Sequence, residues 1–242
     1  MLKDLLKEDI DLKYEKAFKQ LGETNPIFPY FAKKQMGDLV EQIAKSNDIY
    51  KNISSTNQDL AVKAGFSAEE WHTQTHNMDA IVKNDRTRVY TDNYEEWYQN
   101  GYKKNGTPDL IAVKDGEVIH ESQLKYYKSG DDTAKAMREI DRNGKIKYED
   151  MDSLIGPSDQ VDDITKSARR TELKESTPNG RGRVKEASQM VKEKVADKID
   201  TGESKSTSLS KKESEQLAKD QTKFDKKTEI ENKYQTQSTI NQ

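Results

Sequence analysis

The residues best suited to do chemistry lie in the stretch TPDLIAVKDGEVIHESQLKYYK, which runs from Thr107 to Lys128. Four of its side chains, called here the hairpin set, are Asp109, Glu121, Gln123 and Lys125. Mg²⁺ in proteins takes oxygen ligands, typically one or two carboxylates completed by waters and substrate phosphate oxygens. An ammonium beside such an ion can orient an attacking water and offset charge on a pentavalent phosphorane. The hairpin set therefore predicts a Mg²⁺ or Mn²⁺ site that hydrolyses phosphodiester bonds.

A β-hairpin is the element that must position these side chains. Residues 110–113 and the stretch from Val118 to about Tyr127 are rich in β-forming residues, and Lys114-Asp115-Gly116-Glu117 separates them. An Asp-Gly pair between two such runs is a strong hairpin signal. Side chains alternate along a strand, so three of the set share one face, and Asp109 heads the neighbouring strand. The alternative is an exposed hairpin with a polar outer face, which is common in antiparallel sheets.

The order PD, hairpin, ESQLK resembles the signature of the PD-(D/E)XK nuclease superfamily, in the variant with Gln in place of the second acid. The resemblance implies that Asp109 is the metal-binding aspartate, that Gln123 stands at the (D/E) position, and that Lys125 is the catalytic lysine. Glutamine lacks the charge of an acid. The resemblance therefore requires Glu121, two residues earlier on the same face, to supply the missing ligand charge.

A helix that begins near Asn57 or Ser67 precedes the hairpin. Its segment GFSAE resembles the G-x-x-A-E that begins the first core helix of many nucleases of this superfamily. The resemblance assigns Glu69 as a helix acid that reaches the metal site. Glu70 is the adjacent alternative and faces about 100° away around the helix. We expect one of the two glutamates to face the sheet and the other to face solvent.

The same helix carries His72 and His76, which share a face at a spacing compatible with zinc. The sequence offers no third nitrogen ligand nearby. We therefore expect His72 to contact a phosphate or a water in the active site, and His76 to be a partly buried polar residue.

Further candidate substrate contacts surround the hairpin. A basic loop, residues 101–106, leads into Asp109, and a helix with the sequence DDTAKAMREI follows the second strand. A helix at that place is what the superfamily's α-β-β-β-α-β core requires. The residues that follow the hairpin, YYK, are similar to those of uncharacterised proteins of mobile elements. The candidate substrate-binding residues are His72, Lys103, Lys104, Tyr126, Lys128 and Lys135.

The composition limits the size of the hydrophobic core. Of the 242 residues, 31% are hydrophobic and 35% are charged, which is too polar for a compact core along the whole chain. We expect an α+β protein with a small mixed sheet around a central hairpin, organised as an N-terminal helical segment (residues 1–56), a nuclease-like core (residues 57–164) and an extended, polar, partly disordered helical arm (residues 165–242).

The flanking segments suggest helices and one concentrated basic cluster. Apolar residues recur at helical spacing over residues 1–22 and about 30–46, and we expect these helices to pack on the core or on a protein partner. Helical pieces are expected at about 184–199 and 210–234, joined by a linker, TGESKSTS. The cluster consists of Arg169, Arg170, Arg181 and Arg183.

Charge and cysteine content exclude several classes of protein. The net charge of −3 provides no global basic field, so any contact with nucleic acid must be local. The absence of cysteine excludes disulfides, thiolate zinc sites and a cysteine nucleophile. No apolar run has the length of a membrane span, and acids occupy the first residues, where a signal peptide is apolar. We expect a cytoplasmic protein without a membrane partner.

Together these patterns predict a metal-dependent nuclease that acts on DNA in a mobile-element, phage or defence context. One alternative is a catalytically weak nuclease-like fold that binds DNA or serves in an assembly. A second alternative is a structural helical interaction protein in which the hairpin has no catalytic role.

Overall fold

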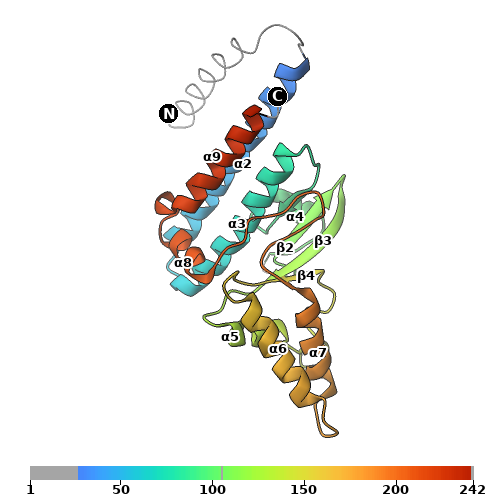
Figure 1. The fold of residues 1–242 in the computed structure, drawn as a ribbon. Helices are drawn as coiled ribbons and strands as arrows, with labels where there is room; N and C mark the ends of the chain where they lie inside the picture. The colour runs from blue at the N-terminus through green and yellow to red at the C-terminus, as the bar shows by residue number, and fades with distance from the viewer. Residues whose placement is uncertain (1–26, 105, 241–242) are drawn as a thin grey trace.

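The computed structural model describes residues 27–104 and 106–240, so the helix expected over residues 1–22 lies outside the described part. The described elements are α2 (Ile27–Ser55), α3 (Leu60–Val82), β1 (Arg88–Tyr90), α4 (Glu95–Gln99), β2 (Leu110–Lys114), β3 (Glu117–Leu124), α5 (Gly130–Met137), β4 (Ser153–Ile155), α6 (Val161–Glu175), α7 (Gly182–Lys194), β5 (Val195–Ala196), α8 (Lys211–Lys219), the 3-10 turn η1 (Gln221–Lys223) and α9 (Asp225–Ile240). The fold is α+β, as predicted (Figure 1).

The sheet has the order β1-β2-β3-β4-β5 and mixed strand directions. The first three strands are antiparallel neighbours, whereas β4 runs parallel to β3 and β5 runs parallel to β4. From α3 to β4 the chain therefore follows the order helix, three strands, helix, strand, with the short α4 inserted before β2. This is the element order that the sequence resemblance requires around the hairpin.

The β2–β3 hairpin turns through Asp115 and Gly116, as predicted. Both residues have positive φ, 56° and 86°, and Lys114 pairs with Glu117, which is the geometry of a two-residue type I′ turn. A β-bulge between Ala112 and Val113 leaves Ile119 as an extra, exposed residue. From Ala112 back to Leu110 the pairing with β3 is regular. The predicted alternation of side chains between the two faces of the sheet therefore holds for Glu121 and Gln123.

Helix α3 is the central element of the larger core. Every residue from Glu70 to Val82 is buried, although many of them are polar. In Figure 1, α3 lies between the sheet and the long pair formed by α2 and α9. Its Trp71 packs in one apolar cluster with Leu110 and Leu124 of the sheet and with Phe224. None of the described helices is long and apolar enough to cross a membrane.

A second apolar cluster forms where α5, α6 and α7 pack against β4. It contains Met137, Ile164, Val191 and Leu154, whereas the next strand residue, Ile155, belongs to the α3 cluster. Successive residues of a strand face opposite sides, so the short strand β4 joins the two halves of the core.

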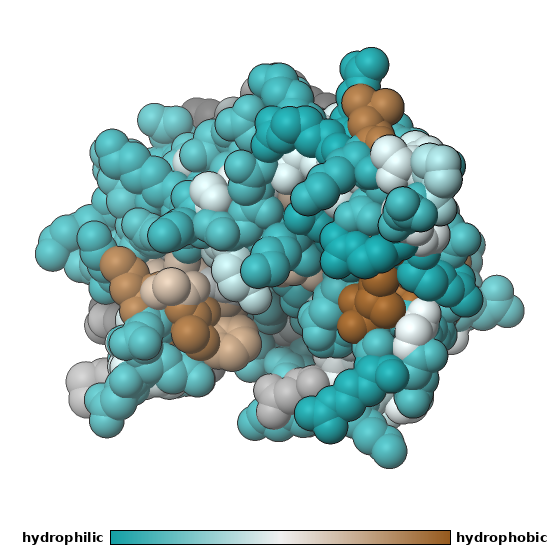
Figure 2. All heavy atoms as spheres, turned by 90° about the horizontal axis from the view of Figure 1, so that it is seen from below, coloured by the Kyte–Doolittle hydropathy of each residue, from teal (hydrophilic) through white to brown (hydrophobic). Residues whose placement is uncertain are grey.

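The C-terminal third packs back onto the core and is not the extended arm that its composition predicted. Phe224 packs edge-on against Trp71, with ring centroids 5.6 Å apart, and Tyr234 of α9 joins Met36 and Leu39 of α2. Apolar residues are few in this segment, but they recur where the helices meet the core. Figure 2 accordingly shows a mostly hydrophilic face with apolar side chains in small, separate groups.

The expected linker, residues 201–208, is part of a strap, residues 197–210, that lies along α3 (Figure 1). Trp71 Nε1 donates to the Thr207 carbonyl at 2.7 Å, and the Thr207 amide donates to Thr75 Oγ1 at 3.0 Å. The Lys205 amide donates to Asp79 Oδ2 at 2.9 Å. The backbone of the expected linker therefore satisfies buried polar groups of α3.

Candidate active site at the head of the hairpin

Polar residues gather where β1 and β3 end and β2 begins. Tyr90 pairs with Ile111 and Leu110 pairs with Ser122. Asp109 directly precedes β2, beside Gln123 of β3. Asp92 follows β1 in a turn that the Tyr94 amide closes on the Thr91 carbonyl, and its charge acts on Asp109.

Asp109 is held there by its neighbours on β3. Its Oδ2 accepts hydrogen bonds from the Leu124 amide, at 2.8 Å, and from Gln123 Nε2. Lys125 Nζ lies 3.9 Å from the same oxygen. Gln123 is only 3% exposed, and its Oε1 has no hydrogen-bond partner among the described residues. Asp109, Gln123 and Lys125 therefore converge, and they leave one buried acceptor oxygen open.

Glu69, on α3, lies near enough to Asp109 for the two carboxyl groups to influence each other. Burial and the neighbouring Asp109 carboxylate raise the pKa of Glu69 well above its usual value. Burial also raises the pKa of Asp109, against the opposing effect of the Lys125 ammonium. The Asp92 carboxylate adds to both shifts. The site thus gathers more negative charge than Lys125 balances, an arrangement that a divalent cation relieves.

Glu70 faces α2 and does not face solvent, contrary to the expectation from the sequence. It is fully buried, and its Oε1 accepts from Ser46 Oγ at 2.6 Å and from the Tyr94 hydroxyl at 2.8 Å. Burial raises its pKa to about 7. Of the two adjacent glutamates, Glu69 is therefore the one directed at the sheet.

Glu121 is set apart from the other members of the hairpin set. Its Oε1 accepts a 2.6 Å hydrogen bond from the Tyr102 hydroxyl, and it pairs across the strands with Ile111. No hydrogen bond or ion pair between described residues joins it to Asp109. It shares their face, as predicted, but the structure does not bring it into their group.

Asp92 is the site acid that sequence reasoning missed. It follows β1, a strand of three residues, and nothing in its local sequence distinguishes it from an ordinary turn aspartate. The signal that identifies it is the register of β1 on β2, which a single sequence does not reveal.

Two predicted substrate contacts lie inside the protein. His72 is fully buried, with Nδ1 2.8 Å from Ser206 Oγ and Nε2 3.1 Å from the Tyr126 hydroxyl. Tyr126 is 7% exposed, and its hydroxyl donates to the Leu209 carbonyl at 3.0 Å. Both side chains tie α3 and the end of β3 to the strap. The prediction of His72 as a phosphate contact is therefore corrected, whereas Tyr126, although mostly buried, lines the groove that begins at Lys125 and stays a predicted substrate contact.

His76 is fully buried and also meets the strap. Its Nε2 lies 2.9 Å from Thr201 Oγ1. The two histidines share a helix face, as predicted, but each is occupied by a hydroxyl group of the strap. They therefore serve packing between two segments.

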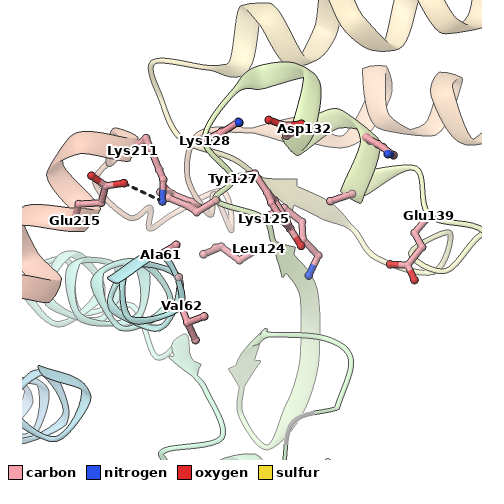
Figure 3. A pocket seen from close by; sticks show the side chains of 14 residues that line it. Ala61, Val62, Leu124, Lys125, Tyr127, Lys128, Asp132, Glu139, Lys211 and Glu215 are labelled. Carbon is pink, nitrogen blue, oxygen red and sulfur yellow. Dashed lines mark ion pairs between the residues drawn. The ribbon is translucent and has the colours of Figure 1, made fainter. Parts of the chain in front are cut away.

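The four lysines predicted as substrate contacts are all exposed. Lys103 and Lys104 lie in the loop that leads to Asp109. Lys128 and Lys135 line a groove of about 840 Å³ that begins at Lys125 (Figure 3). All four remain available to bind phosphates.

Most of the predicted basic cluster is neutralised by ion pairs. Arg170 lies 2.6 Å from Asp131, and Arg183 lies 2.9 Å from Glu186. Arg181 is bound by the Glu175 carboxylate, which is nearly buried. These arginines stabilise the α6–α7 region and offer little free positive charge.

No family model, curated protein or solved structure matches this chain. The candidate site therefore rests on its own geometry.

The oxygen atoms available at the candidate site are of the type that a hard cation such as Mg²⁺ binds. No group of three His, Cys, Asp or Glu side chains able to hold a metal ion is found in residues 27–104 and 106–240. Mg²⁺, however, commonly takes one or two protein carboxylates and completes its shell with water and phosphate oxygens. Asp109, Glu69 and the open Gln123 Oε1 provide that kind of set.

Placing an acid at position 123 tests this fit. Without metal, we expect Gln123→Glu to lower stability by about 2 kcal/mol, or roughly 4–8 °C in Tm, because a second buried carboxylate would face Asp109. Mg²⁺ or Mn²⁺ should recover most of that loss, as followed by thermal melts in EDTA and in each metal. Gln35→Glu, on α2 and remote from the site, serves as the control and should show no metal-dependent recovery. The prediction would be contradicted if the Tm of Gln123→Glu were the same in EDTA as in Mg²⁺ or Mn²⁺.

Proposed function

We propose that this protein is a metal-dependent nuclease that hydrolyses DNA phosphodiester bonds in a mobile-element, phage or defence context. The observation that carries the proposal is the convergence of the Asp109 carboxylate, the Lys125 ammonium and the open Gln123 Oε1. They meet at the open end of the hairpin, away from its turn. A carboxylate, a cation and an unsatisfied buried oxygen side by side are costly for stability alone. A phosphate-cleaving site makes use of all three.

Each residue has a role that follows from its position. Asp109, Glu69 and Gln123 Oε1 would hold Mg²⁺, which when bound polarises the scissile phosphate. Lys125, within 4 Å of Asp109, orients the attacking water and stabilises the charge that develops on the phosphate. Burial and the Asp109 carboxylate raise the pKa of Glu69, and a bound cation would act in the opposite direction by favouring the ionised carboxylate.

One observation favours the second candidate, a nuclease-like DNA-binding module with weak or no catalysis. Gln123 Nε2 already donates to Asp109, so an amide satisfies the carboxylate without a metal. A site in which this hydrogen bond persists would bind DNA through its lysines and leave it uncut.

Cleavage of supercoiled plasmid and of single-stranded DNA by the wild-type chain separates these candidates. We expect nicking and degradation in Mg²⁺ or Mn²⁺ and none in EDTA. Retention of DNA in a gel-shift assay without cutting in either metal would support the binding module. Neither binding nor cutting would overturn both candidates.

A further inference from the structure

The groove of about 840 Å³ is continuous with the candidate active site. Its walls come from the start of α3, the end of β3, α5 and the start of α8 (Figure 3). Leu124 and Lys125 line it, while the Leu124 amide and the Lys125 ammonium also contact Asp109. A chain-like ligand lying in the groove would therefore pass directly to Lys125.

The lining of the groove includes unusual apolar surface. Tyr127 is 50% exposed and Val62 is 45% exposed, and both lie in the groove although they come from different elements. They are two of the five large hydrophobic residues that are exposed in the described part of the chain. A tyrosine ring held open in a concave groove offers a flat face on which a nucleic-acid base can stack.

Free positive charge flanks Tyr127. Lys128 and Lys135 line the groove and are exposed, and no ion pair between described residues engages either of them. Of the three acids in the lining, Glu139 pairs with Lys147 at 3.1 Å, Glu215 pairs with Lys211 at 3.4 Å, and Asp132 keeps its charge. The lining holds four lysines against these three acids, so its net charge is positive and suits phosphate groups.

Lys211 adds a buried cation to the opposite wall. It is 9% exposed, and its Nζ makes no hydrogen bond among the described residues, although Glu215 Oε1 lies 3.4 Å away as an ion pair (Figure 3). An ammonium has three donors. The Lys211 ammonium therefore retains hydrogen-bonding capacity that a phosphate oxygen in the groove can satisfy.

We propose that this groove binds a single-stranded segment of nucleic acid, with a base stacked on Tyr127 and the backbone phosphates on Lys128 and Lys135. The bound strand leads to Lys125, so the inference deepens the proposed function by assigning the substrate as DNA with an unpaired stretch next to the cut. The bases of an intact duplex are stacked on one another and cannot present a face to Tyr127. The volume of the groove is that of a small-ligand pocket, which suits one or two unstacked nucleotides.

Binding measured without metal tests the groove separately from catalysis. Fluorescence anisotropy of labelled oligo(dT) with the full chain in EDTA should show about 5- to 100-fold weaker binding for Tyr127→Ala, and near-normal binding for Tyr127→Phe, which keeps the ring. Lys128→Gln and Lys135→Gln should each make the salt dependence of the binding constant shallower by about 0.7 in log–log slope. Leu173→Ala and Lys219→Gln, exposed residues outside the groove, are the matched controls and should change neither quantity.

Binding of a blunt-ended duplex by the same variants is the comparison measurement. We expect Tyr127→Ala to leave the binding of a long duplex within about twofold, because every base except those of the two end pairs is stacked on both faces. An equal loss for both ligands, or unchanged oligo(dT) binding in Tyr127→Ala and in the lysine variants, would overturn the inference. Variant-sensitive oligo(dT) binding without any metal-dependent cutting would instead defeat the nuclease proposal and leave the groove assignment standing.

Discussion

Asp109→Asn should reduce metal-dependent DNA cleavage by about 10²- to 10³-fold, and Lys125→Ala should do the same. The asparagine variant loses the charge that would hold the cation, yet its side-chain oxygen can still accept the 2.8 Å hydrogen bond from the Leu124 amide. The alanine variant removes the ammonium 3.9 Å from Asp109. Initial rates of plasmid nicking in Mg²⁺, compared with oligo(dT) binding in EDTA, measure catalysis and binding separately.

Glu121→Gln is the matched control for these variants. It removes a carboxylate from the same strand and the same face, but from a residue bound to Tyr102 and not to Asp109. We expect its cleavage rate to stay within about threefold of wild type, since this half-buried carboxylate is bound by the Tyr102 hydroxyl and, among the described residues, makes no hydrogen bond or ion pair with Asp109, Gln123 or Lys125. Equal losses in Glu121→Gln and Asp109→Asn would mean that the two carboxylates act together, as the sequence pattern suggested.

Acid should weaken the attachment of the strap to α3 through its two buried histidines. Burial lowers the pKa of His72 to about 3 and that of His76 to about 4, from an ordinary value of about 6.5. The unfolded chain therefore binds more protons below pH 6.5, and the native state loses stability as the pH falls from there toward 4. Each histidine contributes a loss of about 1.4 kcal/mol per pH unit, so the pair costs about 5 kcal/mol at pH 4.5.

Urea unfolding of wild type and of the variant with both His72→Gln and His76→Gln, from pH 7.5 to 4.5, isolates this effect. Glu70 acts in the opposite direction, because its pKa is raised to about 7 and its neutral form is the one favoured in the fold. Comparison at each pH cancels that contribution, since both proteins contain Glu70. The destabilisation caused by the double substitution at pH 7.5 should shrink or reverse at pH 4.5. A difference that does not change with pH would show that these histidines titrate normally.

The hairpin and its face could be predicted because their signals are local. The Asp-Gly turn fixes the pairing of the two strands, and the two-residue alternation then puts Gln123 and Lys125 on one face. The pairing of β2 with β3 also explains why Asp109 lies beside Gln123. These relationships depend on residues within one hairpin.

The remaining site features depend on contacts between distant segments. Asp92 joins the site only through the register of β1 on β2, and Glu121 leaves it because Tyr102 of the preceding loop provides a hydrogen bond. His72 has a spacing suited to a ligand, but the strap, from another part of the chain, covers it. The C-terminal third was misjudged because average polarity hides a few well-placed apolar residues such as Phe224.

The strap has a consequence for how the protein matures during synthesis. Its contacts with α3, such as those between Trp71 and Thr207 and between His72 and Ser206, join residues more than 130 positions apart. Contacts this distant form late, because a long loop must close before they contribute. The helix that carries Glu69 thus gains its full cover only after residues 197–210 have left the ribosome. Nascent chains that stop near residue 165 would expose the polar face of α3, including Trp71 and His72, which the strap later covers.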